Sequence, residues 1–546
     1  MIHISSNTPV AYICAEYAID DRLPIYAGGL GVLAGDILIE ASEQDIPFVA
    51  VGLYNWKGFS SYPPRVKNGK VADPQDIGFA VVHNESGDRV VISVVIGKKE
   101  IFAQVWKKAW GFASLYLLDT NIAENSDQYD KDIASVLYPE AFDERMRQEI
   151  VLGMGSVALF SALDIHPSVY HLNEGHMSFV ALALALQEHQ HPESFTDALD
   201  RVRPKLVGTK HTILPGAGLF FSKEQSNNYF GKIFQDAEIN HDEFFALGTQ
   251  EHDREQFSTT EFLLRACIRT SAVSALHADF EHKQCPECQI LIPITNGISK
   301  SRWMLPALAS EVSDEELWDI HNAGKQELAH VIQEKTGQVV DTKSLVIVWA
   351  RRIAEYKRPL LIFQDMERLQ KILENSTQPV TILFSGNAYG FDATAKGLLE
   401  QVIEMTKKAD HGRVLYVPGY SLSLSKKLVA GADLWLNTPE FGMEASGTSG
   451  MKASINGILQ LSVGDGWFGE VKDKDCFWTL DPGHTAESLY ELLEHEVIPT
   501  FYARDDRGYP RQWINKMKQA RRIILEHYTT SRMLDEYMHK LYFPEV

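Results

Sequence analysis

The chain has 546 residues, 45% of them hydrophobic and 23% charged, which is typical of a well-packed globular protein with two to four domains. Its formal net charge of −21 at pH 7 argues against a nucleic-acid partner or an anionic-membrane surface, although it leaves room for a local basic pocket. No stretch reaches the roughly 18 apolar residues of a membrane span, residues 1–7 do not resemble a signal peptide, and five cysteines suggest no disulfide framework, so we expect a cytoplasmic protein.

The first part of the chain alternates apolar strand-like stretches with helical ones. Gly28-Gly29-Leu30-Gly31 opens a helical segment after the first of these stretches. Residues 90–96 and 101–106, separated by a turn at Gly97, predict an antiparallel hairpin inserted near 81–118. Buried strands are predicted at residues 10–14, 169–173 and 205–209.

The second part of the chain begins after Asn296-Gly297 and has the spacing of a parallel doubly wound sheet. Its predicted strands lie at residues 345–350, 381–385, 414–417, 434–437 and 459–463, and residues 512–542 predict helix. We therefore expect two α/β domains, residues 1–297 and 298–511, followed by a helical segment at 512–546. Ligands of such sheets bind at the carboxyl ends of the strands, so a shared cleft is the expected site.

Cys285 and Cys288, with His282 before them, form half of a zinc-knuckle pattern. Because the chain has no second such pair, a structural metal would need a ligand from a distant segment. Ordinary loop cysteines are the preferred interpretation, and no metal is expected.

The most informative segment is Glu444-Ala445-Ser446-Gly447-Thr448-Ser449-Gly450-Met451-Lys452. Glycine lets a ligand approach the main chain closely, so the amides of residues 446–448 can face an anion or sugar hydroxyls. A single lysine after such a turn suits a covalent bond to an aldehyde cofactor that carries a phosphate. Alternatively, the segment is a Gly/Ser loop that caps a helix starting near Met451, with Lys452 solvated.

Four cations lie in the segment Arg351-Arg352-Ile353-Ala354-Glu355-Tyr356-Lys357-Arg358. Such a run usually forms a solvated helix face. Here it directly follows the predicted strand 345–350, at the edge of the sheet where ligands bind. Guanidinium groups bind phosphate in a bidentate manner and an ammonium acts as a point charge, so a phosphate site is favoured.

Together these segments resemble the α-glucan phosphorylases that act on glycogen, starch or maltodextrin, in their short bacterial-type form. The lysine segment is similar to the family's pyridoxal-phosphate segment, and residues 351–358 are similar to its phosphate-binding R-x-x-x-Y-K-R segment. Further motifs follow in family order: the Gly28–Gly31 loop, Arg147-Gln148-Glu149-Ile150-Val151-Leu152-Gly153, His171-Leu172-Asn173-Glu174-Gly175-His176, Lys210-His211-Thr212-Ile213-Leu214-Pro215, Thr295-Asn296-Gly297-Ile298 with Arg302-Trp303, Tyr420, and residues 530–537.

The resemblance implies two facing Rossmann-like doubly wound domains of the GT-B glycosyltransferase type, with an interdomain cleft and a C-terminal segment that crosses back to the N-terminal domain. It implies reversible phosphorolysis of α-1,4-glucans to α-glucose 1-phosphate with retention. The phosphate of pyridoxal 5′-phosphate would be the proton-sharing partner of inorganic phosphate. The implied partners are glycogen, starch or maltodextrin together with inorganic phosphate or glucose 1-phosphate, and a homodimer is left open.

The resemblance also implies residue roles. The catalytic residues would be Lys452, Arg352, Lys357 and His211. The cofactor would be bound by Lys452, Thr448, Gly28, Gly29, Trp303, Tyr420 and Arg351. The sugar would be bound by Glu444, Ala445, Ser446, Gly447, Asn296, His211 and Tyr356, while His176 is interpreted as structural.

Three positions depart from the family pattern. Arg351 stands where muscle-type enzymes commonly have lysine, Ser421 where an arginine commonly follows the cofactor tyrosine, and Asn387 where lysine is frequent. Two alternative functions fit the sequence less well. A glycogen- or starch-synthase-like nucleotide-sugar glucosyltransferase would have no role for Lys452, and a catalytically silent glucan-binding protein would not need Lys452, Arg352 and Lys357 together.

Overall fold

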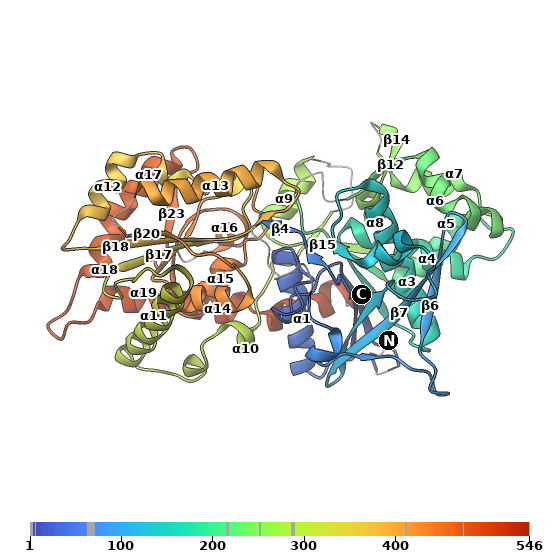
Figure 1. The fold of residues 1–546 in the computed structure, drawn as a ribbon, viewed down its shortest axis with the longest axis horizontal. Helices are drawn as coiled ribbons and strands as arrows, with labels where there is room; N and C mark the ends of the chain where they lie inside the picture. The colour runs from blue at the N-terminus through green and yellow to red at the C-terminus, as the bar shows by residue number, and fades with distance from the viewer. Residues whose placement is uncertain are drawn as a thin grey trace.

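The computed structural model describes residues 4–5, 7–62, 71–213, 218–250, 253–284, 290–409, 412–472 and 474–544. Two largely parallel sheets, one from each part of the chain, organise this mixed α/β structure (Figure 1). The zinc-knuckle half-pattern at Cys285 and Cys288 lies outside the described residues. Within the ranges given above, no helix is both long and apolar enough to cross a membrane.

The N-terminal sheet has the strand order β16-β15-β11-β10-β1-β2-β8-β7-β5. Its strands are parallel from β16 to β8 and are almost wholly buried, as expected where helices cover both faces. The strands predicted near residues 10, 169 and 205 are confirmed, whereas β2, β5, β8, β15 and β16 were not predicted. The bounds are β1 (Val10–Ile13), β2 (Phe48–Leu53), β5 (Ala80–Val81), β8 (Ala113–Asp119), β10 (Val169–Asn173), β11 (Leu206–Thr209), β15 (Arg269–Ala272) and β16 (Ile292–Pro293).

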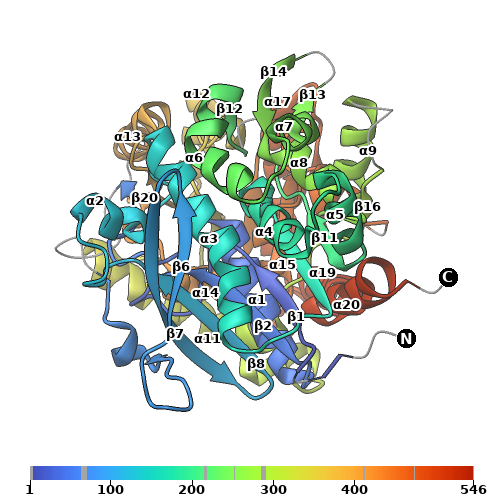
Figure 2. The ribbon, with the colours of Figure 1, turned by 90° about the vertical axis from the view of Figure 1, so that its right-hand side faces the viewer.

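The predicted hairpin is confirmed as β6 (Val91–Ile96) and β7 (Lys99–Trp110), which pair antiparallel around Gly97 at φ +61°. The hairpin extends the N-terminal sheet, because β7 also pairs with β8 (Figure 2). The helix α3 (Phe142–Ala162) packs against β6.

The C-terminal sheet is parallel throughout its described strands, in the order β20-β18-β17-β21-β22-β23. The five predicted strands are confirmed to within one residue, and β23 at the edge was missed. Helices α11 (Asp314–Thr336) and α14 (Leu422–Gly431) lie on the opposite side of the sheet from α13 (Ala393–Lys408) (Figure 1). The bounds are β17 (Leu345–Ala350), β18 (Val380–Ser385), β20 (Val414–Tyr416), β21 (Leu434–Asn437), β22 (Leu459–Val463) and β23 (Trp478–Leu480).

The helix predicted over residues 512–542 is interrupted. Helix α19 (Arg511–His527) ends before Thr529, and α20 (Thr530–Glu536) continues into a π-helical turn, Tyr537–Tyr542. Thr529 caps α20 by accepting the Arg532 amide and forms a parallel bridge with Ile298. The two segments approach so closely here that a Cβ on Gly297 would lie 2.2 Å from the Thr529 carbonyl oxygen.

The break directs the end of the chain onto the N-terminal sheet, where α20 packs beside α1 (Gly29–Glu43) (Figure 2). His171 of β10 lies 2.7 Å from the Tyr542 hydroxyl, and the Arg269 Nε donates to the Leu541 carbonyl. The terminal segment contributes five buried side chains to this core: Met533, Leu534, Tyr537, Leu541 and Tyr542. The terminal segment is therefore part of the N-terminal core.

Leu541→Ala is expected to lower the free energy of unfolding by roughly 3 kcal/mol, because it leaves a cavity under a fully buried side chain. Chemical denaturation measures this loss. Lys540→Ala, one residue away and paired only on the surface with Glu536, is the matched control and should change stability by less than about 1 kcal/mol. Equal effects of the two substitutions would show that the segment is not anchored as described.

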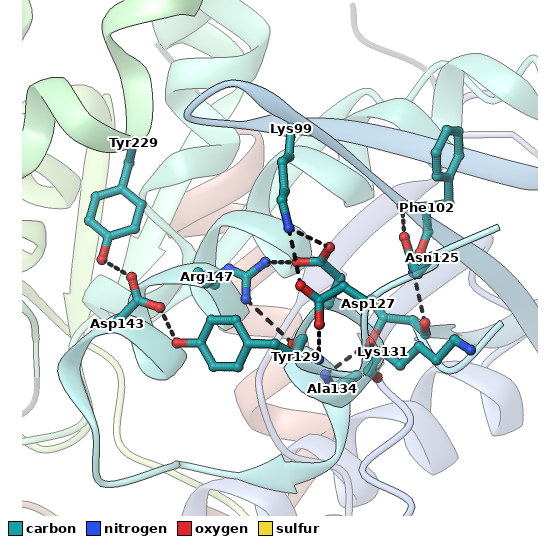
Figure 3. A network of polar contacts seen from close by, with 12 residues as sticks. Lys99, Phe102, Asn125, Asp127, Tyr129, Lys131, Ala134, Asp143, Arg147 and Tyr229 are labelled. Atoms are coloured by element: carbon teal, nitrogen blue, oxygen red, sulfur yellow. Dashed lines mark hydrogen bonds and ion pairs between the residues drawn. The ribbon is translucent and has the colours of Figure 1, made fainter. Parts of the chain in front are cut away.

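The family-like segment that begins at Arg147 lies in α3 and has a structural role (Figure 3). Arg147 is buried, pairs with Asp130, and lies 4.4 Å from the centre of the Tyr129 ring. Lys99 at the hairpin tip reaches the same Asp130 at 3.2 Å. The hydroxyls of Tyr129 and Tyr229 both donate to Asp143 (Figure 3). This network connects the hairpin, α3 and the helix that carries Tyr229.

Glu149, in the same helical segment, is buried beside Arg145, with 3.1 Å between the Arg145 Nε and a carboxylate oxygen. Burial raises the pKa of Glu149 to about 7 despite that partner. The folded protein therefore holds a proton that the unfolded chain releases near pH 4.5, and stability falls as the pH rises from about 4.5 to about 7.

Glu149→Gln keeps the shape of the protonated acid, so it should remove this pH dependence. Between pH 4 and pH 8 the wild type is expected to lose on the order of 3 kcal/mol of unfolding free energy relative to Glu149→Gln. Denaturant titrations at both pH values test this. Glu144→Gln, at an exposed site on the same helix, should leave the pH dependence as in the wild type. A constant difference between wild type and Glu149→Gln would contradict the prediction.

Candidate active site

A cavity of about 610 Å³ is lined by residues that follow strands of both sheets. Most of the residues proposed from the sequence line it together: Gly28, Gly29, His211, Asn296, Arg351, Arg352, Tyr356, Lys357, Tyr420, Glu444, Ala445, Ser446, Gly447, Thr448 and Lys452. Trp303 is the exception, since it is buried behind the wall and faces Lys452.

Lys452 lies in α15 (Ser449–Ser454) and is only 7% exposed, so the alternative of a solvated lysine is wrong. Its Nζ lies 4.7 Å from the centre of the Trp303 ring and donates to the Thr448 hydroxyl at 3.2 Å. The indole is fixed in turn, because its N–H donates to Asp36 at 2.8 Å. Burial lowers the pKa of Lys452 to about 8, so a larger fraction of this amine is neutral near pH 7 than of an ordinary lysine.

The glycine loop is held by a residue that the sequence reasoning missed. Glu16 accepts the amides of Ala27 at 2.7 Å and of Gly28 and Gly31 at 3.2 Å each. The Gly28 amide, in a loop that the resemblance assigns to the cofactor, is therefore directed to a carboxylate. Gly28 instead adjoins Arg352, whose Cδ would lie 3.9 Å from an added Cβ. Glu16 lies between a buried strand and the glycines, which is the signal that could have identified it.

The cations of the segment 351–358 differ in their burial and in their partners. Arg351 is buried; one guanidinium N–H donates to the Leu436 carbonyl at 2.7 Å, and its Nε has no hydrogen-bond partner among the described residues. Burial lowers the pKa of Arg351 to about 10. Arg352 is exposed at the cavity wall. Lys357 is buried and pairs with Glu444. From the sequence, Lys357 was expected to bind phosphate and Glu444 to bind the sugar.

His211 is neutral, because burial lowers its pKa to about 3. Its Nε2 lies 3.1 Å from the Asn173 side-chain oxygen, and its amide donates to Glu174 at 2.7 Å. Glu174 has the strained backbone angle φ +70°, and its second carboxylate oxygen is buried without a partner in the described structure. Strain and an unpaired polar atom at a cavity wall are typical of binding sites.

Two hydrogen bonds join the halves of the chain where residues 444–447 line the cavity. The Asn296 side-chain amide donates to the Ser446 hydroxyl at 3.1 Å, and the Ser274 hydroxyl donates to the Ala445 carbonyl at 2.7 Å. The Asn296 side-chain oxygen has no partner among the described residues. It is therefore available to accept from a ligand hydroxyl.

The departures from the family pattern have local explanations. Ser421 is the N-cap of α14, where its hydroxyl accepts the Leu424 amide. The Asn387 side chain donates to the Tyr420 carbonyl at 3.1 Å. Neither residue contributes a cation, whereas Arg351 lies close enough to Tyr420 to interact with it electrostatically.

Aromatic side chains from both halves meet at another wall of the cavity. Phe59 and Tyr389 are stacked with ring centres 5.2 Å apart, and the Tyr138 hydroxyl donates to Glu16 at 2.8 Å. No sequence motif singled out these residues, because only the fold brings them together.

The residues present fit an aldehyde cofactor that carries a phosphate. Lys452 is a buried amine with a lowered pKa beside a flat aromatic ring. Arg351 offers an unpartnered guanidinium nitrogen in the same cavity wall. The class that this geometry defines is a mixed α/β protein whose cavity contains a buried lysine together with Arg351 and Arg352.

Comparison with known proteins agrees with that class. The family model for carbohydrate phosphorylase matches residues 304–519. The chain is 34% identical to the maltodextrin phosphorylase of Thermococcus litoralis, covering 98% of this chain and 70% of that relative. It is 33% identical to the glycogen phosphorylase of Aquifex aeolicus, covering 98% and 86%. An uncharacterized protein of Methanocaldococcus jannaschii is 28% identical over 98% of this chain and 99% of its own length. The chain belongs to the carbohydrate phosphorylase family.

Proposed function

We propose that this protein catalyses the reversible phosphorolysis of α-1,4-glucans, releasing α-glucose 1-phosphate with retention of configuration. The observation that carries the proposal is the buried Lys452 in a cavity that also contains Arg351, Arg352 and Lys357. The names of its relatives, maltodextrin and glycogen phosphorylase, support the substrate class.

The architecture we propose is the GT-B type, with residues 1–297 and 298–511 as facing Rossmann-like domains and 512–546 crossing back. The two parallel sheets and the terminal segment in the N-terminal core support this division. Closure of two such domains would exclude water from a reactive sugar cation.

Pyridoxal 5′-phosphate is the cofactor that we propose, held by Lys452, Thr448 and Arg351 with Trp303 behind the lysine. When bound, it would supply a phosphate group that shares a proton with inorganic phosphate. Tyr420 and the Gly28-Gly29 loop line the same cavity and would enclose the group.

Inorganic phosphate would bind to Arg352 and Lys357, whose charges offset repulsion between two phosphate groups in a dry cleft. The glucosyl hydroxyls would bind to Glu444, to the Ala445–Gly447 backbone and to Asn296, with Tyr356 beside them. Because His211 is neutral, it would orient a sugar hydroxyl rather than donate a proton as an acid. Phe59, Tyr138 and Tyr389 would provide apolar walls for the rest of the glucan.

Phosphate-dependent release of glucose 1-phosphate from maltose, longer maltodextrins and glycogen tests the function. A phosphorylase releases it only when phosphate is present. A nucleotide-sugar glucosyltransferase would require a nucleotide sugar instead, and a silent binding protein would retain glucan without product. Either of those results would refute the proposal.

A further inference from the structure

We propose that Asp465 is a positioning residue, which fixes the sugar-binding loop Gly442–Gly447 and through it the placement of Glu444 against Lys357. The inference rests on the proposed phosphorolysis and adds a residue that does not line the cavity. It predicts a kinetic effect of a side chain that touches neither substrate nor cofactor.

The contacts of Asp465 divide between two segments. It follows β22 and precedes α16 (Gly466–Glu470), whose first amide donates to one of its carboxylate oxygens at 2.8 Å. Its other oxygen accepts the amide of Gly442 at 2.8 Å and that of Glu444 at 3.0 Å. Only one oxygen therefore caps its own helix, and the other holds a loop more than twenty residues earlier in the chain.

The loop needs such an anchor because its ends are glycines in the left-handed region, Gly442 at φ +85° and Gly447 at φ +81°. Glycines there permit many backbone conformations in the absence of external contacts. The segment after Asp465 adds a second attachment, since the Trp467 amide donates to the Ser446 carbonyl at 3.0 Å. A Cβ on Gly466 would lie 2.4 Å from that same carbonyl oxygen, so the two segments are in direct contact.

Anchoring the Glu444 amide fixes where the Glu444 side chain begins. Asp465 is itself buried, and burial, with a smaller contribution from the nearby Glu444 carboxylate, raises its pKa. The Glu444 carboxylate is directed instead to Lys357, with which it pairs. Asp465 thus fixes the position of the Glu444 carboxylate through a hydrogen bond to the Glu444 amide. Through Glu444 it also fixes the position of the Lys357 ammonium, which we propose binds phosphate.

Asp465→Asn and Asp465→Ser test the role with maltoheptaose and inorganic phosphate as substrates. Asparagine replaces one oxygen by an N–H donor, and serine can still cap α16 but cannot reach the loop with a second oxygen. Asp465→Ser is expected to lose roughly 10–100-fold in kcat/KM, the usual effect of removing a residue that orients a ligand-binding group, whereas Asp465→Asn should lose less because its one oxygen can still accept both loop amides. KM for phosphate should rise, while the bound cofactor, measured by absorbance, stays stoichiometric.

Asp392→Asn is the matched control, because Asp392 is an aspartate N-cap whose side chain accepts the Ala395 amide of its own helix, α13. It should lower the melting temperature slightly and leave kcat/KM unchanged. If Asp465→Ser keeps wild-type kinetics, the inference is wrong. If the wild type itself releases no glucose 1-phosphate, the proposed function fails instead.

A double-mutant cycle with Glu444→Gln separates positioning from general destabilisation. If Asp465 acts through Glu444, then Asp465→Ser should add little to the loss already caused by Glu444→Gln. Independent losses, which multiply in the double variant, would overturn the proposed route through Glu444.

Discussion

Lys452→Ala is expected to purify without pyridoxal 5′-phosphate and to show no measurable phosphorolysis. The substitution removes a buried amine that lies over the Trp303 ring and is therefore already placed for a covalent bond to an aldehyde. Absorbance of the cofactor and phosphate-dependent release of glucose 1-phosphate measure the two losses. In the wild type, borohydride reduction followed by peptide mapping should place the label on Lys452.

The lowered pKa of Lys452 gives this prediction a pH dependence. Only the neutral amine is nucleophilic, and its fraction grows as the pH rises through about 8. Reconstitution of the apoprotein should accordingly become faster from pH 6.5 to pH 9, with a midpoint near 8. Lys426 of α14 is a suitable control, because it also lies within electrostatic range of Asp36 and Arg302. The Lys426→Ala variant should keep its cofactor. Label on another lysine would reject the assignment.

Lys357→Ala should reduce phosphorolysis at least a hundredfold, a loss of roughly 3 kcal/mol of transition-state stabilisation, while cofactor content is retained. We propose that the Lys357 ammonium binds inorganic phosphate. Its removal also leaves Glu444 buried without a partner, so a lower melting temperature is expected as well.

Two comparisons separate these effects. Adding Glu444→Gln to Lys357→Ala removes the unpaired charge and should restore stability but not activity. Arg352→Ala, at an exposed position, should lose activity to a similar extent with little change in stability. Near-wild-type turnover of Lys357→Ala, alongside an active wild type, would show that phosphate binds elsewhere.

Much of this protein could be predicted from local sequence, because the relevant signals are local. The strands β17, β21 and β22 are short, fully buried and rich in apolar residues, as expected for parallel strands with helices on both faces. The charged and glycine-rich segments directly after these strands had to lie at the carboxyl edge of the sheet, which is why so many of the predicted residues line one cavity.

The tertiary structure decided what depends on segments far apart in the chain. The break at Thr529 follows from its bridge to Ile298, and helical periodicity contains no information about that contact. Glu16 on the glycine amides, Lys357 on Glu444, and Asp465 on the loop at Gly442 are polar partners chosen by proximity in space. Residue type and spacing predicted which side chains could bind a phosphate or a sugar, but burial and long-range pairing set their charge states and orientations.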